Sequence, residues 1–250
     1  MQQPAIVRWE WIGDGWNLFT QQWGAWVVHM LAFVLVMLIP IIPFYAVAVA
    51  ASLAAASTDH PEGASILVFL MMLIMIPLVM AAASFLLGGA YKSAMKQLRG
   101  EPFRIGDLFS AGDCFLRVWG VVLLVAILGA IGGMLCILPA FIVQGLCFFA
   151  IPLVVERRMG PIEAIQASIA ATKKDWLMFT VFALVVQIIA SAGSILCYVG
   201  LLASYPLLFT ITSVAYRDVF GVTGANRTQS YNPPPPPDYG MNPPPPSSWQ

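Results

Sequence analysis

Four long segments of this sequence contain no Asp, Glu, Lys or Arg. They cover residues 15–58, 63–91, 118–155 and 176–216. A helix that crosses the hydrocarbon core of a bilayer needs about 20 mainly apolar residues. The first two segments therefore fit one membrane span each, and each of the last two is long enough for two spans joined by a tight turn.

The composition excludes several classes of protein. A soluble domain carries roughly 25% charged residues, whereas this chain of 250 residues is 10% charged and 60% hydrophobic. So few charges could not cover so much apolar surface in water, which excludes a soluble enzyme and a wholly disordered chain. Twelve basic and twelve acidic residues leave no net charge to attract nucleic acid. The sequence predicts a multi-pass protein whose partners are membrane lipids and not nucleic acid.

Glycine and proline residues mark the turns within the two longer segments. Gly132 and Pro139 divide the third segment, and Gly193 and Pro206 divide the fourth, because these residue types end or bend helices. We therefore predict an all-α membrane protein with six transmembrane helices. The predicted spans cover about residues 26–49, 65–90, 118–136, 140–155, 177–196 and 201–217. Re-entrant hairpins are the alternative for the last two pairs, whose members are short.

The basic residues predict the orientation of this arrangement. With six spans, all twelve Lys and Arg fall on one side of the membrane. The opposite loops carry only Asp59, His60 and Glu62, or no ionisable residue. Lys and Arg in short loops stay on the cytoplasmic side. We therefore expect both termini in the cytoplasm and the chain in a bacterial inner (plasma) membrane.

Residues 1–25 form a separate interfacial segment in this interpretation, ahead of the transmembrane domain at 26–217. The segment contains charged residues and lacks the apolar region and cleavage site of a signal peptide, so we expect no cleavable leader. Apolar side chains at spacings of three and four predict an amphipathic helix on the inner leaflet. These side chains are Ile12, Trp16, Phe19 and Trp23. A simple aromatic belt for the first span is the alternative.

Residues 218–250 are predicted to form a disordered, proline-rich cytoplasmic tail. Residues 231–250 read YNPPPPPDYGMNPPPPSSWQ, and polyproline stays extended without internal hydrogen bonds. Proline-rich segments bind aromatic-lined grooves, and the tail contains the short PPxY pattern. The candidate partner-binding residues are Pro236, Pro237, Tyr239 and Trp249. We interpret the tail as a solvated spacer, with partner binding as the alternative.

Two segments between the predicted spans carry many of the charges. In residues 91–117, Gly100 and Pro102 separate a continuation of the second span from a short interfacial helix. Residues 161–172 are predicted to form a helix, because Pro161 suits its first position and Glu163 its first turn. One face of this helix consists of small residues that could pack closely on another helix: Ala164, Ala167, Ser168 and Ala171.

Several short motifs lie in these segments and in the last predicted span. They are Tyr91-x-x-Ala94, Arg99-Gly100-Glu101, Asp107-Leu108-Phe109, Val155-Glu156, the residues Gly160, Ala164, Ser168 and Thr172, and Pro206 with Ala215-Tyr216-Arg217-Asp218. With these motifs the chain resembles bacterial multi-pass integral membrane protein families of unknown function over about residues 10–220. It is also similar to the membrane-anchor domain of some bacterial glycerophosphodiester phosphodiesterases. The resemblance implies a compact six-helix membrane domain without catalytic residues, because the chemistry of those enzymes resides in a separate soluble domain.

Polar residues suited to catalysis or transport are few. Apart from Arg217 at the end of the last one, the predicted spans contain no Asp, Glu, Lys or Arg, the residues that proton relays and ion sites in membranes use. His29 is expected at the inner interface, and Gln144 and Gln187 are each expected to bond to a neighbouring helix. Carboxylates beside arginines are expected to form solvated ion pairs, and the residues concerned are Glu101, Asp107, Asp113, Arg99 and Arg104.

The four cysteines show no C-x-x-C spacing of the kind found in zinc and redox sites. Cys136 and Cys197 fall near the outer ends of two spans, where apolar packing is expected and a disulfide is the alternative. We therefore predict no catalytic residue, no metal site and no cofactor.

These observations favour a non-enzymatic inner-membrane protein that acts as a scaffold or an accessory subunit. Its tail would serve as a spacer or as the segment that binds another protein. A transporter or channel for a small or amphipathic solute is the alternative. A lipid-modifying enzyme would need a cluster of polar catalytic groups at the interface, for which the sequence supplies only the carboxylates and arginines named above.

Overall fold

The computed structural model describes residues 5–56, 62–135, 137–195 and 200–222. These residues are almost entirely helical and include no strand, which confirms the all-α prediction. The helices are α1 (Glu10–Gln21), α2 (Trp23–Ala56), α3 (Glu62–Leu98), α4 (Phe115–Leu135), α5 (Ile137–Leu146), α6 (Ala150–Arg157), α7 (Pro161–Thr172), α8 (Trp176–Ser191), α9 (Leu201–Ser204) and α10 (Pro206–Phe220). Three 3-10 segments accompany them: η1 (Ile105–Asp113), η2 (Lys173–Asp175) and η3 (Ala192–Ile195).

Five segments of the described chain are long and apolar enough to cross a membrane. They are Trp23–Leu53, Val68–Leu98, Phe115–Met134, Leu138–Arg157 and Pro161–Ile195. Each contains most or all of one of the first five predicted spans, so the chain has the helices of a multi-pass membrane protein. The region of the sixth predicted span forms two separate helices, α9 and the 15-residue α10, with Tyr205 between them.

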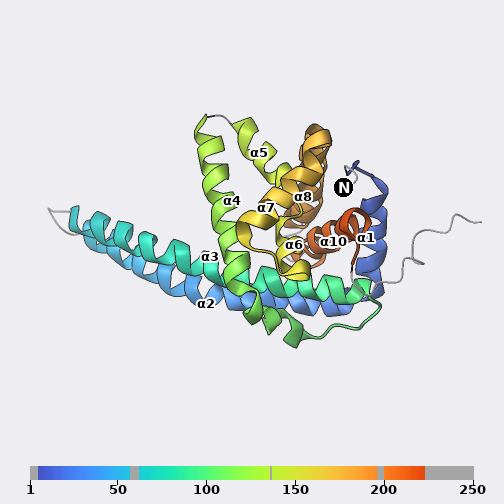
Figure 1. Ribbon diagram of the computed structural model, residues 1–250. Coiled ribbons are helices and arrows are strands. Elements are labelled where there is room, and N and C mark those ends of the chain that lie inside the picture. Colours follow the sequence, from blue (N-terminus) through green and yellow to red (C-terminus); the bar gives the residue numbers. More distant parts are fainter. Residues whose placement is uncertain (1–4, 57–61, 136, 196–199, 223–250) are drawn as a thin grey trace, which may run out of the picture.

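The antiparallel helices α2 and α3 form a long hairpin that projects away from the other helices (Figure 1). Both helices run without a break through their prolines, Pro40 and Pro43 in α2 and Pro77 in α3. Large apolar side chains on the outer half of the hairpin are exposed, for example Ile39 and Ile74. The hairpin runs across the direction of α4, α5 and α8 (Figure 1). The described helices therefore do not form one parallel bundle, which is the arrangement that a compact six-helix domain would suggest.

The core lies where the inner half of the hairpin meets α1, α6, α10 and η1. Trp26 of α2 is fully buried, and its ring lies parallel to that of Phe209 in α10 at a centroid distance of 6.2 Å. The same indole packs on Phe103 in the loop before η1, at 4.8 Å. Its Nε1 donates a hydrogen bond of 2.8 Å to Gln97 Oε1 of α3. Trp26 therefore connects α2 to α3, to the loop before η1 and to α10.

The predicted N-terminal helix exists as α1, and one face of it also packs into the protein core, which the sequence did not predict. Trp11, Leu18 and Phe19 are buried, whereas Trp16 and Trp23 are exposed. Trp11 fixes the orientation of α1 about its own axis, because its ring packs on Phe182 of α8 and its Nε1 donates a hydrogen bond of 3.0 Å to Asp218 of α10. The helix is therefore part of the folded core, with its remaining tryptophans available to the membrane interface.

Candidate functional site

A helix break lies inside the fourth predicted span. The sequence predicts one helix over 140–155, but α5 ends at Leu146 and α6 begins at Ala150. Two backbone groups of the turn are bound by side chains of α7 instead. Ser168 Oγ donates to Leu146 O at 2.7 Å and accepts from the Phe149 N–H at 3.1 Å, and Thr172 Oγ1 donates to Leu146 O at 3.2 Å. Irregular backbone at membrane depth needs such internal partners.

The small-residue face of α7 brings these hydroxyls to the break. Ala164, Ser168 and Thr172 are four residues apart, lie on one face of the helix and are each fully buried. Their small side chains allow the backbone of α7 to approach closely. The predicted helix at 161–172 is confirmed, including the contact of Glu163 Oε2 with the Gly160 N–H at 3.4 Å. The sequence indicated the packing face but not the hydrogen bonds that it makes.

Replacing Ser168 by Ala is expected to destabilise the folded protein by about 1–3 kcal/mol, because the Phe149 N–H would lose its partner in a buried site. The measurement is unfolding in mixed micelles with increasing sodium dodecyl sulfate. Ser191→Ala is the control, since Ser191 is exposed and its hydroxyl bonds to Ile188 O of its own helix. Equal stability of the two variants would count against the role assigned to Ser168.

A largely buried ion pair lies at the end of α6. Arg99 Nη2 contacts Glu156 Oε1 at 2.7 Å and Oε2 at 2.5 Å. The Glu156 side chain is 5% exposed, and that of Arg99 is 27% exposed. The pair joins the C-terminal ends of α3 and α6 across 57 residues of sequence. Sequence reasoning placed Arg99 among the solvated pairs and missed its partner, because nothing in the local spacing connects the two residues.

Two further ion pairs hold η1 against α3. Lys96 Nζ contacts Asp107 Oδ1 at 2.7 Å, and the Arg104 backbone N–H donates to Asp107 Oδ2 at 2.8 Å. Burial opposes ionisation of Asp107, but these hydrogen bonds outweigh it and lower the pKa of its carboxyl. The hydrogen bond from Lys92 likewise lowers the pKa of Asp113. These carboxylates therefore pair with Lys96 and Lys92 of α3 and not with Arg99 or Arg104, and the pairs connect elements of the fold rather than only facing solvent.

Asp218 connects the two ends of the described chain. Besides the bond from Trp11, Asp218 Oδ2 contacts Arg8 Nη1 at 3.5 Å. The sequence assigned this aspartate to the tail, but it lies in α10, which continues to Phe220. Arg157 Nη2 of α6 donates to the Phe220 carbonyl at 2.6 Å. The charged ends of α3, α6 and α10 are thus joined to the N-terminal segment.

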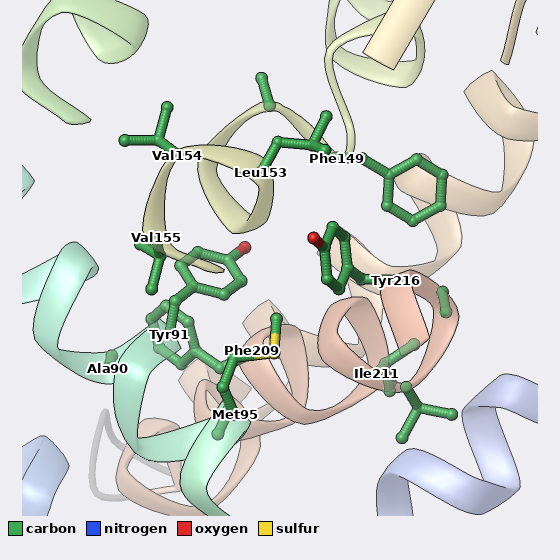
Figure 2. Close-up of a cluster of buried hydrophobic side chains, with 14 of the residues drawn as sticks. Ala90, Tyr91, Met95, Phe149, Leu153, Val154, Val155, Phe209, Ile211 and Tyr216 are labelled. Atoms are coloured by element: carbon green, nitrogen blue, oxygen red, sulfur yellow. The ribbon is translucent and has the colours of Figure 1, made fainter. Parts of the chain in front are cut away.

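Buried hydroxyl groups line the contact between α3 and α10. Figure 2 shows the hydroxyls of Tyr91 and Tyr216 pointing toward one another beneath α6. Both tyrosines are buried, as are Thr212 and Ser213 on the adjoining turns of α10. Ser213 Oγ has no hydrogen-bond partner among the described residues. Sequence reasoning missed this group because hydroxyl side chains in an apolar span resemble ordinary helix-packing residues.

Three polar residues singled out in the sequence occupy unexpected places. His29 is fully buried rather than interfacial, with its ring against Phe103 at 5.6 Å. Gln144 and Gln187 are exposed instead of bonding to a neighbouring helix. Contact between α5 and α8 runs through Gly145, where a Cβ would lie 2.6 Å from Thr180 Cα. Gly145 therefore faces α8, and the neighbouring Gln144 lies on the outer surface of α5.

The remaining predicted sites are only partly within the described residues. Cys114 and Cys147 are buried free thiols, whereas Cys136 and Cys197 lie outside the described residues. No group of three or more His, Cys, Asp or Glu suited to a metal ion occurs in the part of the chain that the structure describes. The tail candidates also lie outside that part: Pro236, Pro237, Tyr239 and Trp249.

Comparisons with known proteins identify similar chains of unknown activity. An uncharacterized protein of Mycobacterium bovis is 29% identical over an alignment that covers 90% of this chain and 72% of the relative. Two uncharacterized proteins of Mycobacterium tuberculosis, at 29% and 28% identity, show the same coverage. No protein-family model matches the chain, and no solved structure matches it.

Proposed function

We propose that the protein is a non-enzymatic scaffold or accessory subunit of the bacterial inner membrane. The proposal rests on the ion pairs that join different segments of the chain. The carboxylates of Asp107, Asp113, Glu156 and Asp218 each contact a basic side chain of another segment. Such contacts hold the helix ends together as a fixed platform, from which the chain continues into the tail. A membrane-anchor role, as the resemblance to phosphodiesterase anchor domains implies, is compatible with this proposal.

We further propose six spans with both termini in the cytoplasm, the sixth being formed by α9 and α10. The one-sided distribution of Lys and Arg supports this orientation. Topology-reporter fusions after residues 60, 135 and 198 are expected to report the outer side, and fusions after residues 100, 165 and 225 the cytoplasm. A cytoplasmic signal at residue 60 would overturn the six-span arrangement. Cytoplasmic signals at 135 or 198 would indicate re-entrant hairpins instead.

In this proposal the tail binds a partner protein through its PPxY pattern. Affinity purification of the full chain is expected to recover a protein that is lost when residues 222–250 are deleted, while the membrane domain keeps its expression and melting temperature. Tyr239→Ala is expected to lose the same protein. Tyr231→Ala is the matched control, because Tyr231 lies in the tail outside the pattern. Recovery of identical proteins from all variants would contradict partner binding by the tail.

The buried hydroxyls between α3 and α10 favour one second function, a transporter or channel for a small solute. Polar groups inside an apolar membrane protein commonly line solute pathways. In proteoliposomes, Ser213→Ala and Tyr216→Phe would then alter the efflux of trapped small solutes relative to the unsubstituted protein. Efflux equal to that of protein-free vesicles for the unsubstituted chain would exclude this function for the solutes tested.

A further inference from the structure

A shallow cavity of about 500 Å³, open to the surface along much of its boundary, lies between the beginning of α2 and the loop that precedes η1. The wall from α2 consists of Gly24, Ala25 and Val28, and the opposite wall includes Phe103, Arg104 and Ile105. Figure 1 shows this loop and η1 beside the inner end of the hairpin. The cavity lies at the start of the first candidate membrane span, next to the exposed Trp23, where tryptophan prefers the headgroup layer.

Close packing of Phe103 fixes the loop wall of the cavity. Its buried ring lies against Trp26 at 4.8 Å and against His29 at 5.6 Å. The Arg104 backbone is held by Asp107, as described above. The cavity is therefore bounded by an anchored loop and a helix.

The chemistry of the lining is amphipathic. Val28 and Ile105 are exposed apolar side chains, and Arg104 supplies a guanidinium that forms no ion pair within the described ranges 5–56, 62–135, 137–195 and 200–222. Asp107 and Glu101 are equally near to Arg104 in sequence. Asp107 is already bound by Lys96, and no ion pair joins Glu101 to Arg104 within the described residues. An unpaired guanidinium beside an apolar wall at the membrane boundary complements a phosphate linked to an acyl chain.

We propose that this cavity binds an anionic phospholipid, with Arg104 holding the phosphate and one acyl chain lying along Val28 and Ile105. The site is independent of the proposed scaffold function, because it uses no residue of the tail. A lipid with a net negative headgroup is favoured over a zwitterionic one, since no carboxylate of the cavity lining would balance a choline.

Native mass spectrometry of the full chain, released from detergent after addition of phosphatidylglycerol or phosphatidylcholine, tests the proposal. We expect one phosphatidylglycerol to be retained in preference to phosphatidylcholine. Arg104→Gln should reduce this preference roughly tenfold, as expected for loss of a charged hydrogen bond. Arg117→Gln is the charge-matched control, because Arg117 does not line the cavity.

Gly24→Leu tests the cavity without changing its charge. A Cβ at Gly24 would meet no atom within 4 Å, and the same holds at Gly13 of α1. Gly24→Leu should fill the cavity and reduce retention of phosphatidylglycerol, whereas Gly13→Leu should leave it unchanged. If Gly24→Leu fails to fold, Gly106→Leu fills the cavity from the loop side.

Three results would overturn the proposal. The first is equal retention of the two lipids by the unsubstituted chain. The second is the same loss of preference in Arg104→Gln and Arg117→Gln, which would indicate a general effect of charge. The third is displacement of the lipid by millimolar inorganic phosphate, which would assign the site to a free anion.

Discussion

Replacing Glu156 by Gln is expected to destabilise the folded protein by about 3 kcal/mol. Removing one charge of a buried ion pair costs roughly 3–5 kcal/mol. We expect the lower end of this range, because Arg99 keeps about a quarter of its side chain exposed and can be partly hydrated. Unfolding in mixed micelles with increasing sodium dodecyl sulfate measures the loss.

A double-mutant cycle shows whether this loss comes from the pair itself. Arg99→Met should cost a comparable amount, and the double variant Arg99→Met/Glu156→Gln should recover a substantial part of the summed loss, since both partners of the pair are then neutral. Glu101→Gln is the control, because Glu101 is exposed and neighbours the pair in sequence. Strictly additive effects of the two single substitutions would contradict the coupling of α3 to α6 through this pair.

Replacing Gly89 by Ala is expected to cost at least about 1–3 kcal/mol, as overpacking of a well-packed contact does. A Cβ at Gly89 would lie 2.7 Å from Leu108 Cα and closer still to the Leu108 carbonyl. The obstructing atoms are backbone atoms of η1, which is held in place by Lys92 and Lys96 and cannot yield as the end of a side chain would. The melting temperature in detergent measures the effect.

Gly13→Ala is the control with the opposite expected sign. Gly13 lies within α1, and a Cβ there would meet no atom within 4 Å. Alanine stabilises a helix by roughly 0.8–1 kcal/mol relative to glycine, so this substitution should raise the melting temperature slightly. A rise in both variants would show that η1 does not pack on α3 at Gly89.

The helical class and the first five candidate spans could be predicted because they follow from uncharged length alone. The break between α5 and α6 could not, since Leu146, Phe149 and Ala150 belong to a uniformly apolar stretch. Its partners, Ser168 and Thr172, are about 20 residues away and become visible only when α7 is folded back. Hydrophobic periodicity describes the faces of a single helix. It does not indicate where the backbone of that helix breaks and needs hydrogen bonds from another segment.

The sequence indicated some of the charged residues that form ion pairs, but it did not indicate their partners. The loop carboxylates Asp107 and Asp113 were expected beside arginines, but their partners are Lys96 and Lys92 of α3. The Arg99–Glu156 pair joins separate segments, and only the folded arrangement of α3 and α6 determines it. The packing of α1 into the core was not predicted for the same reason, because Asp218 and Phe182, which fix Trp11, come from distant parts of the chain.

The packing of α1 against α10 has a consequence for the biogenesis of the protein. Helix α1 finds much of its binding surface in α10 and the rest partly in α8, through Phe182, and contacts of such high sequence separation form late. Until translation is complete, the apolar face around Trp11 and Leu18 has no native partner on α10, and exposed apolar faces of this kind attract chaperones and proteases. A chain that ends before α10 would thus lack a large part of the surface that covers α1, and the apolar side chains left exposed would make such a chain prone to aggregation.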